Sequence, residues 1–255
     1  MATLSRLTAA DTQPQPAQLR AQLRMREMIL SGELPGGSRI AELNLVQKLG
    51  LSRTPIRGAL QRLEQEGLLQ ALPNRGYAVR VFSEREIGEA IELRGMIEGF
   101  AARLAAERGA PPVVLNEARL VLRQIDALLQ QARLTDADFS TYVALNQSFH
   151  NLLSELAGSE LLQRELERAA AMPFASPSAF VVAQANSADA RDMFIVAQHQ
   201  HWQVLDAIEH GEGMRAESVM REHSRLAQHN LRDAVLHGTA RGLPGVQLIR
   251  KRNAA

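Results

Sequence analysis

Apolar residues in the first part of the chain recur every three or four positions, and glycine ends each run. This spacing predicts three helices, over residues 17–31, 42–49 and 52–66. In the third helix, Ser52 takes the N-cap position and Pro55 lies in the first turn, where a missing N–H costs little. Residues 1–16 have no such period and contain two prolines, so we expect a disordered lead-in.

The pattern then changes to alternation. Residues 68–72 and 77–81 predict two short strands around a turn, because every second residue from Tyr77 on is large and apolar. Three helices followed by a hairpin, with a three-residue turn between the second and third helices, is the order of a winged helix-turn-helix. We therefore assign residues 17–82 to a winged helix-turn-helix domain with a small β-hairpin wing.

From Ser83 onward the chain has no strand pattern, and helical periods fill it to residue 237. Ser83 and Glu86 match a capping box at the start of the first of these helices. The predicted helices cover residues 83–108, 113–133, 136–157, 159–171, 189–210 and 212–237. Six helices with short links suit a bundle. We expect a mainly α protein, with an all-α six-helix domain over residues 83–237 and a loose basic tail over residues 238–255.

Composition narrows the class of protein. The chain has 255 residues and no cysteine, which excludes a disulfide framework, a thiolate zinc site and cysteine nucleophile chemistry. It has no run of about 18 uncharged apolar residues, the length that a membrane helix needs. Its N-terminus lacks the apolar core of a secretory signal. We therefore expect a cytoplasmic protein with no membrane partner.

The net charge of +1 hides an uneven distribution. Residues 1–82 carry 11 basic and 6 acidic side chains, residues 83–240 carry 14 and 22, and residues 241–255 carry four basic and no acidic ones. A basic front on an acidic body suggests that the first domain contacts a polyanion. A charge difference of this size also arises by chance, so the charge distribution alone does not identify a nucleic-acid-binding domain.

The polar face of the predicted third helix carries candidate DNA-reading residues. Arg53, Arg57 and Gln61 lie four positions apart and form one stripe. In a major groove, arginine bonds guanine O6 and N7 and glutamine bonds adenine N6 and N7. Thr54 and the N–H groups of the first turn suit a phosphate. The alternative is a solvated helix face, against which the turn, the wing and the basic charge argue together. The candidates at the wing tip are Arg75 and Gly76.

Three histidines and one asparagine fall on helix faces that should be buried. Asn146 and His150 lie one turn apart in one helix, His201 lies in a second and His223 in a third. Neutral imidazoles are good ligands for zinc and also suit nickel and related ions. A lone histidine on an apolar face is more often a satisfied core residue. For three histidines on three different helices, a structural role in the core and a shared divalent metal ion are equally good interpretations of the residues alone.

Arg94 and Glu98 continue the inward-facing positions of the first helix in this domain. One interpretation is an internal salt bridge that ties helices together. The other is an effector site, in which Arg94 grips a carboxylate bidentately beside the metal.

Several strings of the first domain occur in the order typical of one family. They are Ile29-Leu-Ser-Gly-Glu-Leu-Pro-Gly36, Leu49-Gly-Leu-Ser-Arg-Thr-Pro-Ile-Arg57, Ala59-Leu-Gln-Arg-Leu-Glu-Gln-Glu-Gly-Leu68 and Asn74-Arg-Gly76. Together they resemble the DNA-binding domain of GntR-family transcription regulators. The resemblance implies that Arg53, Thr54 and Arg57 contact operator DNA, assisted from the wing by Arg75 and Gly76. Gly58 stands where relatives usually carry glutamate.

The second domain carries a resemblance of its own, through Glu92-Leu-Arg-Gly-Met-Ile-Glu98, Asn146-Gln-Ser-Phe-His150, His201 and His223. It resembles the FCD effector domain of the FadR subfamily, and six helices indicate the VanR-like branch. In metal-binding members an aspartate and three histidines hold the ion, so here Asn146 replaces the aspartate. The resemblance also implies a pocket for a small carboxylate or sugar acid, near Arg94 and Glu98.

Two classes of function follow. The first is a DNA-binding transcription regulator, a homodimer on a pseudo-palindromic operator, whose DNA binding responds to a small organic acid; the family makes a repressor the expectation. The second is a metal-dependent hydrolase or lyase with an accessory basic domain, with Glu98 as the candidate general base. Because no other acidic residue is placed to act as a base, we expect a regulator and not an enzyme.

Overall fold

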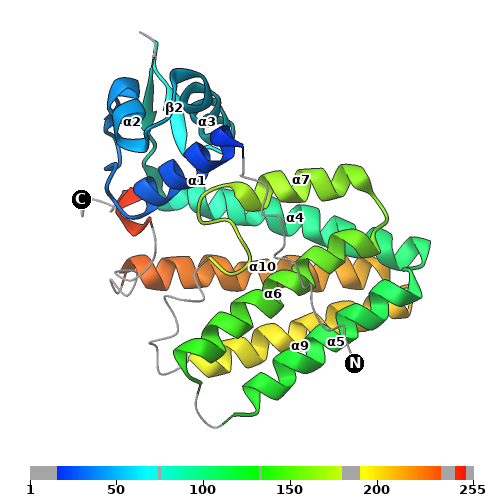
Figure 1. Ribbon diagram of the computed structural model, residues 1–255. Coiled ribbons are helices and arrows are strands. Elements are labelled where there is room, and N and C mark those ends of the chain that lie inside the picture. The colour runs from blue at the N-terminus through cyan, green and yellow to red at the C-terminus, as the bar shows by residue number, and fades with distance from the viewer. Residues whose placement is uncertain (1–15, 74–75, 132–133, 180–189, 237–244, 251–255) are drawn as a thin grey trace, which may run out of the picture. The chain divides into compact units, whose positions relative to one another are not determined.

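The computed structural model describes residues 16–73, 76–131, 134–179, 190–236 and 245–250 (Figure 1). The chain forms two compact units, Met1–Val79 and Arg80–Ala255. The division lies slightly before the boundary expected from the sequence, because β4 (Phe82–Ser83) pairs with a strand of the second unit.

The N-terminal unit has the predicted order of three helices and a hairpin. Its helices are α1 (Ala17–Leu30), α2 (Glu42–Leu49) and α3 (Arg53–Gln65). Its antiparallel sheet has the order β1 (Arg39–Ile40), β3 (Tyr77–Val79), β2 (Leu69–Ala71). The pair of β2 and β3 is the predicted wing. The sequence pattern does not predict β1, because a two-residue strand is too short to show alternation.

The apolar stripes of α1 and α3 pack on each other and leave the opposite face of α3 to solvent. The buried side chains of the two helices include Met25, Met28, Ile29, Ile56, Leu60 and Leu63.

The turn between α2 and α3 depends on Gly50, whose φ of +63° is left-handed and favours glycine. Ser52 is the N-cap of α3 as predicted, but its side chain makes no capping hydrogen bond with the described residues. A Cβ at Gly58 would lie 2.7 Å from the carboxamide of Gln18. Because Gln18 is exposed and flexible, this contact does not require glycine, and the structure does not explain Gly58.

The second unit is built from helices that match the predicted ones within a few residues. They are α4 (Glu84–Arg108), α5 (Pro112–Leu129), α6 (Asp136–Leu156), α7 (Glu160–Ala171), α9 (Ala190–Glu209) and α10 (Gly213–Leu236). The capping box of Ser83 and Glu86 begins α4 as predicted, and Thr135 and Asp138 begin α6 in the same way. α5 contacts both α6 and α9, and α10 runs along α4 (Figure 1).

Two glycines of α4 allow α10 to approach closely. A Cβ at Gly95 would lie 2.1 Å from Ser224 Oγ, and one at Gly99 would lie 2.8 Å from Arg221 Cγ and 3.1 Å from the carbonyl oxygen of Glu217. Any side chain at these two positions would therefore push the helices apart.

The described part of the predicted tail differs from a loose segment. Residues 246–250 form a short 3₁₀ helix, η2 (Val246–Leu248), and a strand, β5 (Ile249–Arg250), which pairs in parallel with β4, whereas residues 238–244 and 251–255 lie outside the described residues. Leu248 is completely buried. A two-residue strand is too short to show alternation in the sequence. The basic residues around it also make the segment look like a polar tail, although it contains apolar side chains. The described helices include none with the length and apolar surface that a bilayer crossing needs.

Candidate nucleic-acid interface and metal centre

The four predicted reading residues on α3 are all exposed. Arg53, Thr54, Arg57 and Gln61 occupy the face opposite the buried side chains of Ile56, Leu60 and Leu63. Of the two wing candidates, Arg75 lies outside the described residues. Gly76 has a φ of +102°, and a Cβ there would meet no atom within 4 Å. The bare backbone at Gly76 is therefore open to a ligand.

One of these arginines is held by the neighbouring helix. Nε of Arg57 donates to both carboxylate oxygens of Glu42, at 3.0 Å each. Glu42 is the first residue of α2, so this ion pair joins the two helices of the helix-turn-helix.

The three predicted histidines converge in the second unit. His150 comes from α6, His201 from α9 and His223 from α10, and one nitrogen of each lies within 4.8 Å of the others. All three are buried. Their approach confirms that the three helical stripes face one point, which sequence periodicity alone could only suggest.

Hydrogen bonds to the Nδ1 atoms orient the three rings. His150 Nδ1 lies 2.8 Å from Glu98 Oε1, His201 Nδ1 lies 3.2 Å from Gln198 Oε1, and His223 Nδ1 lies 3.2 Å from Gln200 Oε1. Each partner atom is an acceptor, so each Nδ1 carries a hydrogen, and on a neutral ring Nε2 then keeps a lone pair. This is the arrangement by which proteins prepare histidine for a metal.

The amide that holds His201 is itself fixed. Gln198 donates through Nε2 to the carbonyl oxygen of Leu122 at 2.8 Å and to Asp126 Oδ1 at 2.7 Å. These two bonds leave the oxygen of Gln198 to face His201, which confirms the assignment of its hydrogen.

The lone pairs that remain fit a cation. His150 Nε2 is buried and has no hydrogen-bond partner among the described residues. His201 Nε2 and His223 Nε2 lie 3.2 Å apart, and neither has a hydrogen to give the other when both hydrogens are on Nδ1. A cation between these nitrogens would satisfy all three, so the residues fit a divalent metal such as zinc.

Asn146 lies one turn before His150 and is also buried. Its Nδ2 donates to Ser178 Oγ at 3.0 Å. The side-chain oxygen is the only atom of this amide that could bind a metal.

Arg94 and Glu98 form an internal salt bridge, which is one of the two interpretations of their sequence positions. Both are buried, and Arg94 Nη1 donates to Glu98 Oε2 at 2.6 Å. The other oxygen of Glu98 accepts from His150, so the carboxylate joins the arginine to the candidate metal centre. Nε of Arg94 has no hydrogen-bond partner within the described part of the chain. The salt bridge therefore leaves one buried donor of Arg94 for a ligand.

Burial and neighbouring charges shift the pKa values of this cluster. Burial opposes the charge on Glu98, but Arg94 and His150 outweigh it and lower the pKa of Glu98 to about 2. Burial, followed by the field of His223 and His150, lowers the pKa of His201 well below its ordinary value. Burial and His150 lower the pKa of His223 to about 3. Both histidines are therefore neutral near pH 7, as metal ligands must be.

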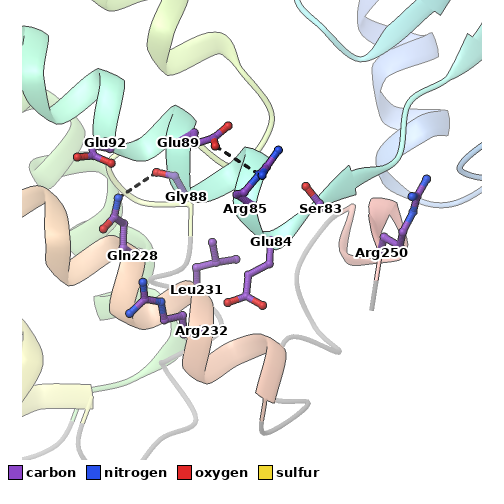
Figure 2. A pocket seen from close by; sticks show the side chains of 10 residues that line it. All are labelled: Ser83, Glu84, Arg85, Gly88, Glu89, Glu92, Gln228, Leu231, Arg232 and Arg250. Carbon is purple, nitrogen blue, oxygen red and sulfur yellow. Dashed lines mark hydrogen bonds and ion pairs between the residues drawn. The ribbon is translucent and has the colours of Figure 1, made fainter. Parts of the chain in front are cut away.

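Arg94, Tyr142, Asn146 and His223 line a cavity of about 80 Å³. A larger, more open hollow of about 680 Å³ lies between the start of α4, the end of α10 and Arg250 (Figure 2). Figure 2 shows Gln228 reaching the carbonyl oxygen of Gly88 and Arg85 turned to Glu89. Arginines and glutamates line this hollow, whereas the small cavity is lined by buried polar side chains and is therefore the better ligand site of the two.

Comparisons with known proteins agree with both units. Residues 17–79 match "Bacterial regulatory proteins, gntR family", and residues 89–226 match "FCD domain". A Streptomyces ambofaciens protein named "Uncharacterized HTH-type transcriptional regulator in unstable DNA locus" is 31% identical over 214 residues, 80% of each chain. The "Probable D-xylose utilization operon transcriptional repressor" of Paenarthrobacter nicotinovorans is 28% identical over 195 residues, 76% of this chain and 80% of that protein.

The fold has solved counterparts. The structure of E. coli McbR/YncC matches with a TM-score of 0.60 at 20% identity, covering 86% of this chain and 98% of that one. The helix-turn-helix unit, the helical unit that matches the FCD domain and the relatives together define a DNA-binding transcription regulator. The chain belongs to the GntR family and carries an FCD domain, which confirms the resemblance seen in its motifs.

The alternative of a hydrolase or lyase is not supported. The relatives and both domains are those of a regulator, not of an enzyme. Glu98, the candidate general base, is already bound on both oxygens by Arg94 and His150.

The lowered pKa values predict an acid-sensitive apoprotein. Between pH 6.5 and the folded pKa values, the unfolded chain takes up protons at His201 and His223 that the native state does not bind, so stability falls as the pH falls. In the presence of a chelator, His201→Gln should reduce the slope of unfolding free energy against pH by up to one proton, about 1.4 kcal/mol per pH unit. Urea unfolding followed by circular dichroism measures the slope. His199→Gln, on the exposed side of α9, is the matched control, and equal slopes in the two variants would contradict the assignment.

Proposed function

We propose that this regulator is a homodimeric, cytoplasmic repressor whose α3 helices read operator DNA and whose helical unit senses a small organic acid beside a divalent metal. The observation that carries the proposal is the convergence of three buried histidines in a DNA-binding regulator, one of which, His223, lines a cavity together with Arg94 and Asn146.

Four exposed residues of α3 have a role in the proposed contact with DNA. Arg53 and Arg57 would donate to guanine edges and Gln61 to an adenine edge in the major groove. Thr54, in the first turn, would bind a phosphate and set the register of the helix. Gly76 would let the wing backbone approach the DNA, with Arg75 beside it in the sequence.

The helical unit would hold a metal with His150, His201 and His223, and with the side-chain oxygen of Asn146. The bound ion would act as a Lewis acid that attracts an anionic ligand. Arg94 would donate from its buried Nε to a carboxylate of that ligand, while Glu98 keeps the guanidinium in place. The cavity of about 80 Å³ limits the part of the acid held there to a few heavy atoms.

An exposed apolar groove supports the homodimer. Leu93, Met96 and Phe100 of α4 and Leu161 of α7 line a hollow of about 660 Å³ and are between 36% and 60% exposed. Contiguous apolar surface of this kind marks a protein interface. Arginines and glutamates among its lining residues supply both signs of charge, which a two-fold-related copy of the same surface can pair with. The occupant we propose is a second copy of the chain.

The repressor assignment is carried over from relatives. The Paenarthrobacter protein is named as a repressor of a sugar-utilization operon. An acid that binds one arrangement of the two units better than another would shift the spacing of the two reading helices and release the operator.

The first prediction from this proposal concerns DNA reading. On a duplex that the wild-type protein selects from a random library, Arg53→Ala and Arg57→Ala should each weaken specific binding about 5- to 100-fold, the value of one lost bidentate base contact. Fluorescence anisotropy measures the affinity. Arg62→Ala, which removes an exposed arginine from another face of α3, is the control. Affinities that match the control would refute α3 as the reading helix.

The second prediction concerns the metal and the acid. Zinc together with a dicarboxylate such as succinate should raise the melting temperature of wild-type protein more than the sum of the two separate shifts. His201→Ala should abolish the shift with zinc, and His199→Ala should retain it. Asn146→Asp should bind zinc at least about tenfold more tightly, because a carboxylate adds charge to the ligand set. Isothermal titration calorimetry measures the zinc affinity, and an unchanged zinc response in His201→Ala would rule out this centre.

The third prediction concerns assembly. Met96→Asp should convert the dimer into a monomer, because it places a charge in the apolar groove. Analytical ultracentrifugation reports the mass. Val113→Asp, on an exposed position of α5, should leave the dimer unchanged. A Met96→Asp variant that remains dimeric would show that the subunits meet elsewhere.

A further inference from the structure

The ion pair between α2 and α3 has a geometry that leaves Arg57 ready to read a base. Both oxygens of Glu42 accept from Nε of Arg57, at 3.0 Å each. The pair lies within the N-terminal unit and joins the first residue of α2 to the second turn of α3.

Counting donors shows what the pair leaves over. A guanidinium has five N–H groups, one on Nε and four on the two Nη atoms. Glu42 takes the single hydrogen on Nε. In the part of the chain that the structure describes, the Nη atoms form no hydrogen bond, and the Arg57 side chain is 65% exposed. The outer edge of the guanidinium, with its two Nη atoms, is therefore the edge that can meet guanine O6 and N7.

The pair is not placed to stabilise the fold. An exposed arginine–carboxylate pair contributes little to folding stability, because solvent screens it and two side chains lose freedom. The effect of this ion pair on DNA binding would be larger than its effect on folding stability. A side chain already held in its bound orientation loses less freedom on contact with the base, so the contact forms with higher affinity.

The negative charge of Glu42 would also favour the specific sequence over other sequences. A carboxylate close to the DNA repels phosphates, and this repulsion weakens every complex regardless of sequence. Where Arg57 meets its base, the orienting effect compensates for the repulsion; on other sequences, only the repulsion remains. Glu42 would therefore widen the gap between specific and non-specific affinity.

We propose that Glu42 is a specificity-determining positioning residue, which holds Nε of Arg57 so that the Nη edge faces one guanine of each operator half-site. The proposal rests on the proposed function of α3 and adds a residue from the preceding helix that touches no base itself.

The test compares Glu42→Ala, Glu42→Gln, Arg57→Ala and the double variant Glu42→Ala/Arg57→Ala in the full-length protein. The probes are the duplex selected by wild type, the same duplex with each base pair changed in turn, and a random-sequence duplex, each at two salt concentrations. Glu27→Gln, which removes the same charge from an exposed ion pair with Arg24 on α1, is the matched control.

We expect Glu42→Ala to lower the ratio of specific to non-specific affinity about tenfold, with Glu42→Gln intermediate and Glu27→Gln within twofold of wild type. The lost preference should fall on the same base pair as in Arg57→Ala. The double variant should be no worse than Arg57→Ala, because the two residues act through one contact. A partly unfolded variant would weaken all duplexes equally, so loss of preference at one base pair cannot arise from misfolding.

Three results would overturn the inference. One is a Glu42→Ala ratio within twofold of wild type while Arg57→Ala loses its base preference. Another is a Glu42→Ala variant that binds all duplexes more tightly by the same factor, which would leave Glu42 as a repulsive charge only. The third is a double variant whose loss is the product of the two single losses. If Arg57→Ala itself keeps every base preference, the proposed reading role of Arg57 fails, and the inference fails with it.

Discussion

The helical unit depends on the close approach of α4 and α10. Gly95 has no side chain, and a Cβ at this position would lie 2.1 Å from Ser224 Oγ. The backbone of α4 therefore packs directly against a side chain of α10. Arg94 precedes Gly95 and His223 precedes Ser224 in the chain. The contact that packs the helices therefore also brings a guanidinium and an imidazole to one cavity. A larger residue at position 95 would therefore change both the packing of α4 on α10 and the geometry of the site.

Glu98 connects the charged groups that this packing buries. Burying a carboxylate or a guanidinium alone is costly, and pairing offsets the cost only when hydrogen bonds satisfy the remaining atoms. Glu98 uses one oxygen for Arg94 and the other for His150. A ligand that binds Arg94 and a metal that binds His150 would consequently act on the same carboxylate. By linkage, an effect of the metal on acid binding must be matched by an equal effect of the acid on metal binding.

The sequence predicts the long elements and the convergence of side chains on them, because both follow from helical period. The stripes place Asn146, His150, His201 and His223 on inward faces, and the structure buries all four. The sequence weakly indicates Gln198 as a partner of His201, because the two residues lie one helical turn apart. It does not indicate Gln200, because this residue contacts His223 of another helix. The strands β1 and β5 escaped prediction for a related reason: their partners lie far along the chain, and two residues are too few to show a period.

The asparagine at position 146 changes the charge balance of the candidate centre. A divalent ion held by three neutral imidazoles and an amide would bring two positive charges into a buried site, where Glu98 and Arg94 already cancel each other. An aspartate would remove one of these charges; Asn146 removes none. Uncompensated charge in a site of low dielectric is strongly unfavourable, so in the proposed function an anion in the adjoining cavity would supply the remainder. Asn146 would then favour a centre in which metal and acid bind together, with each weak in the absence of the other.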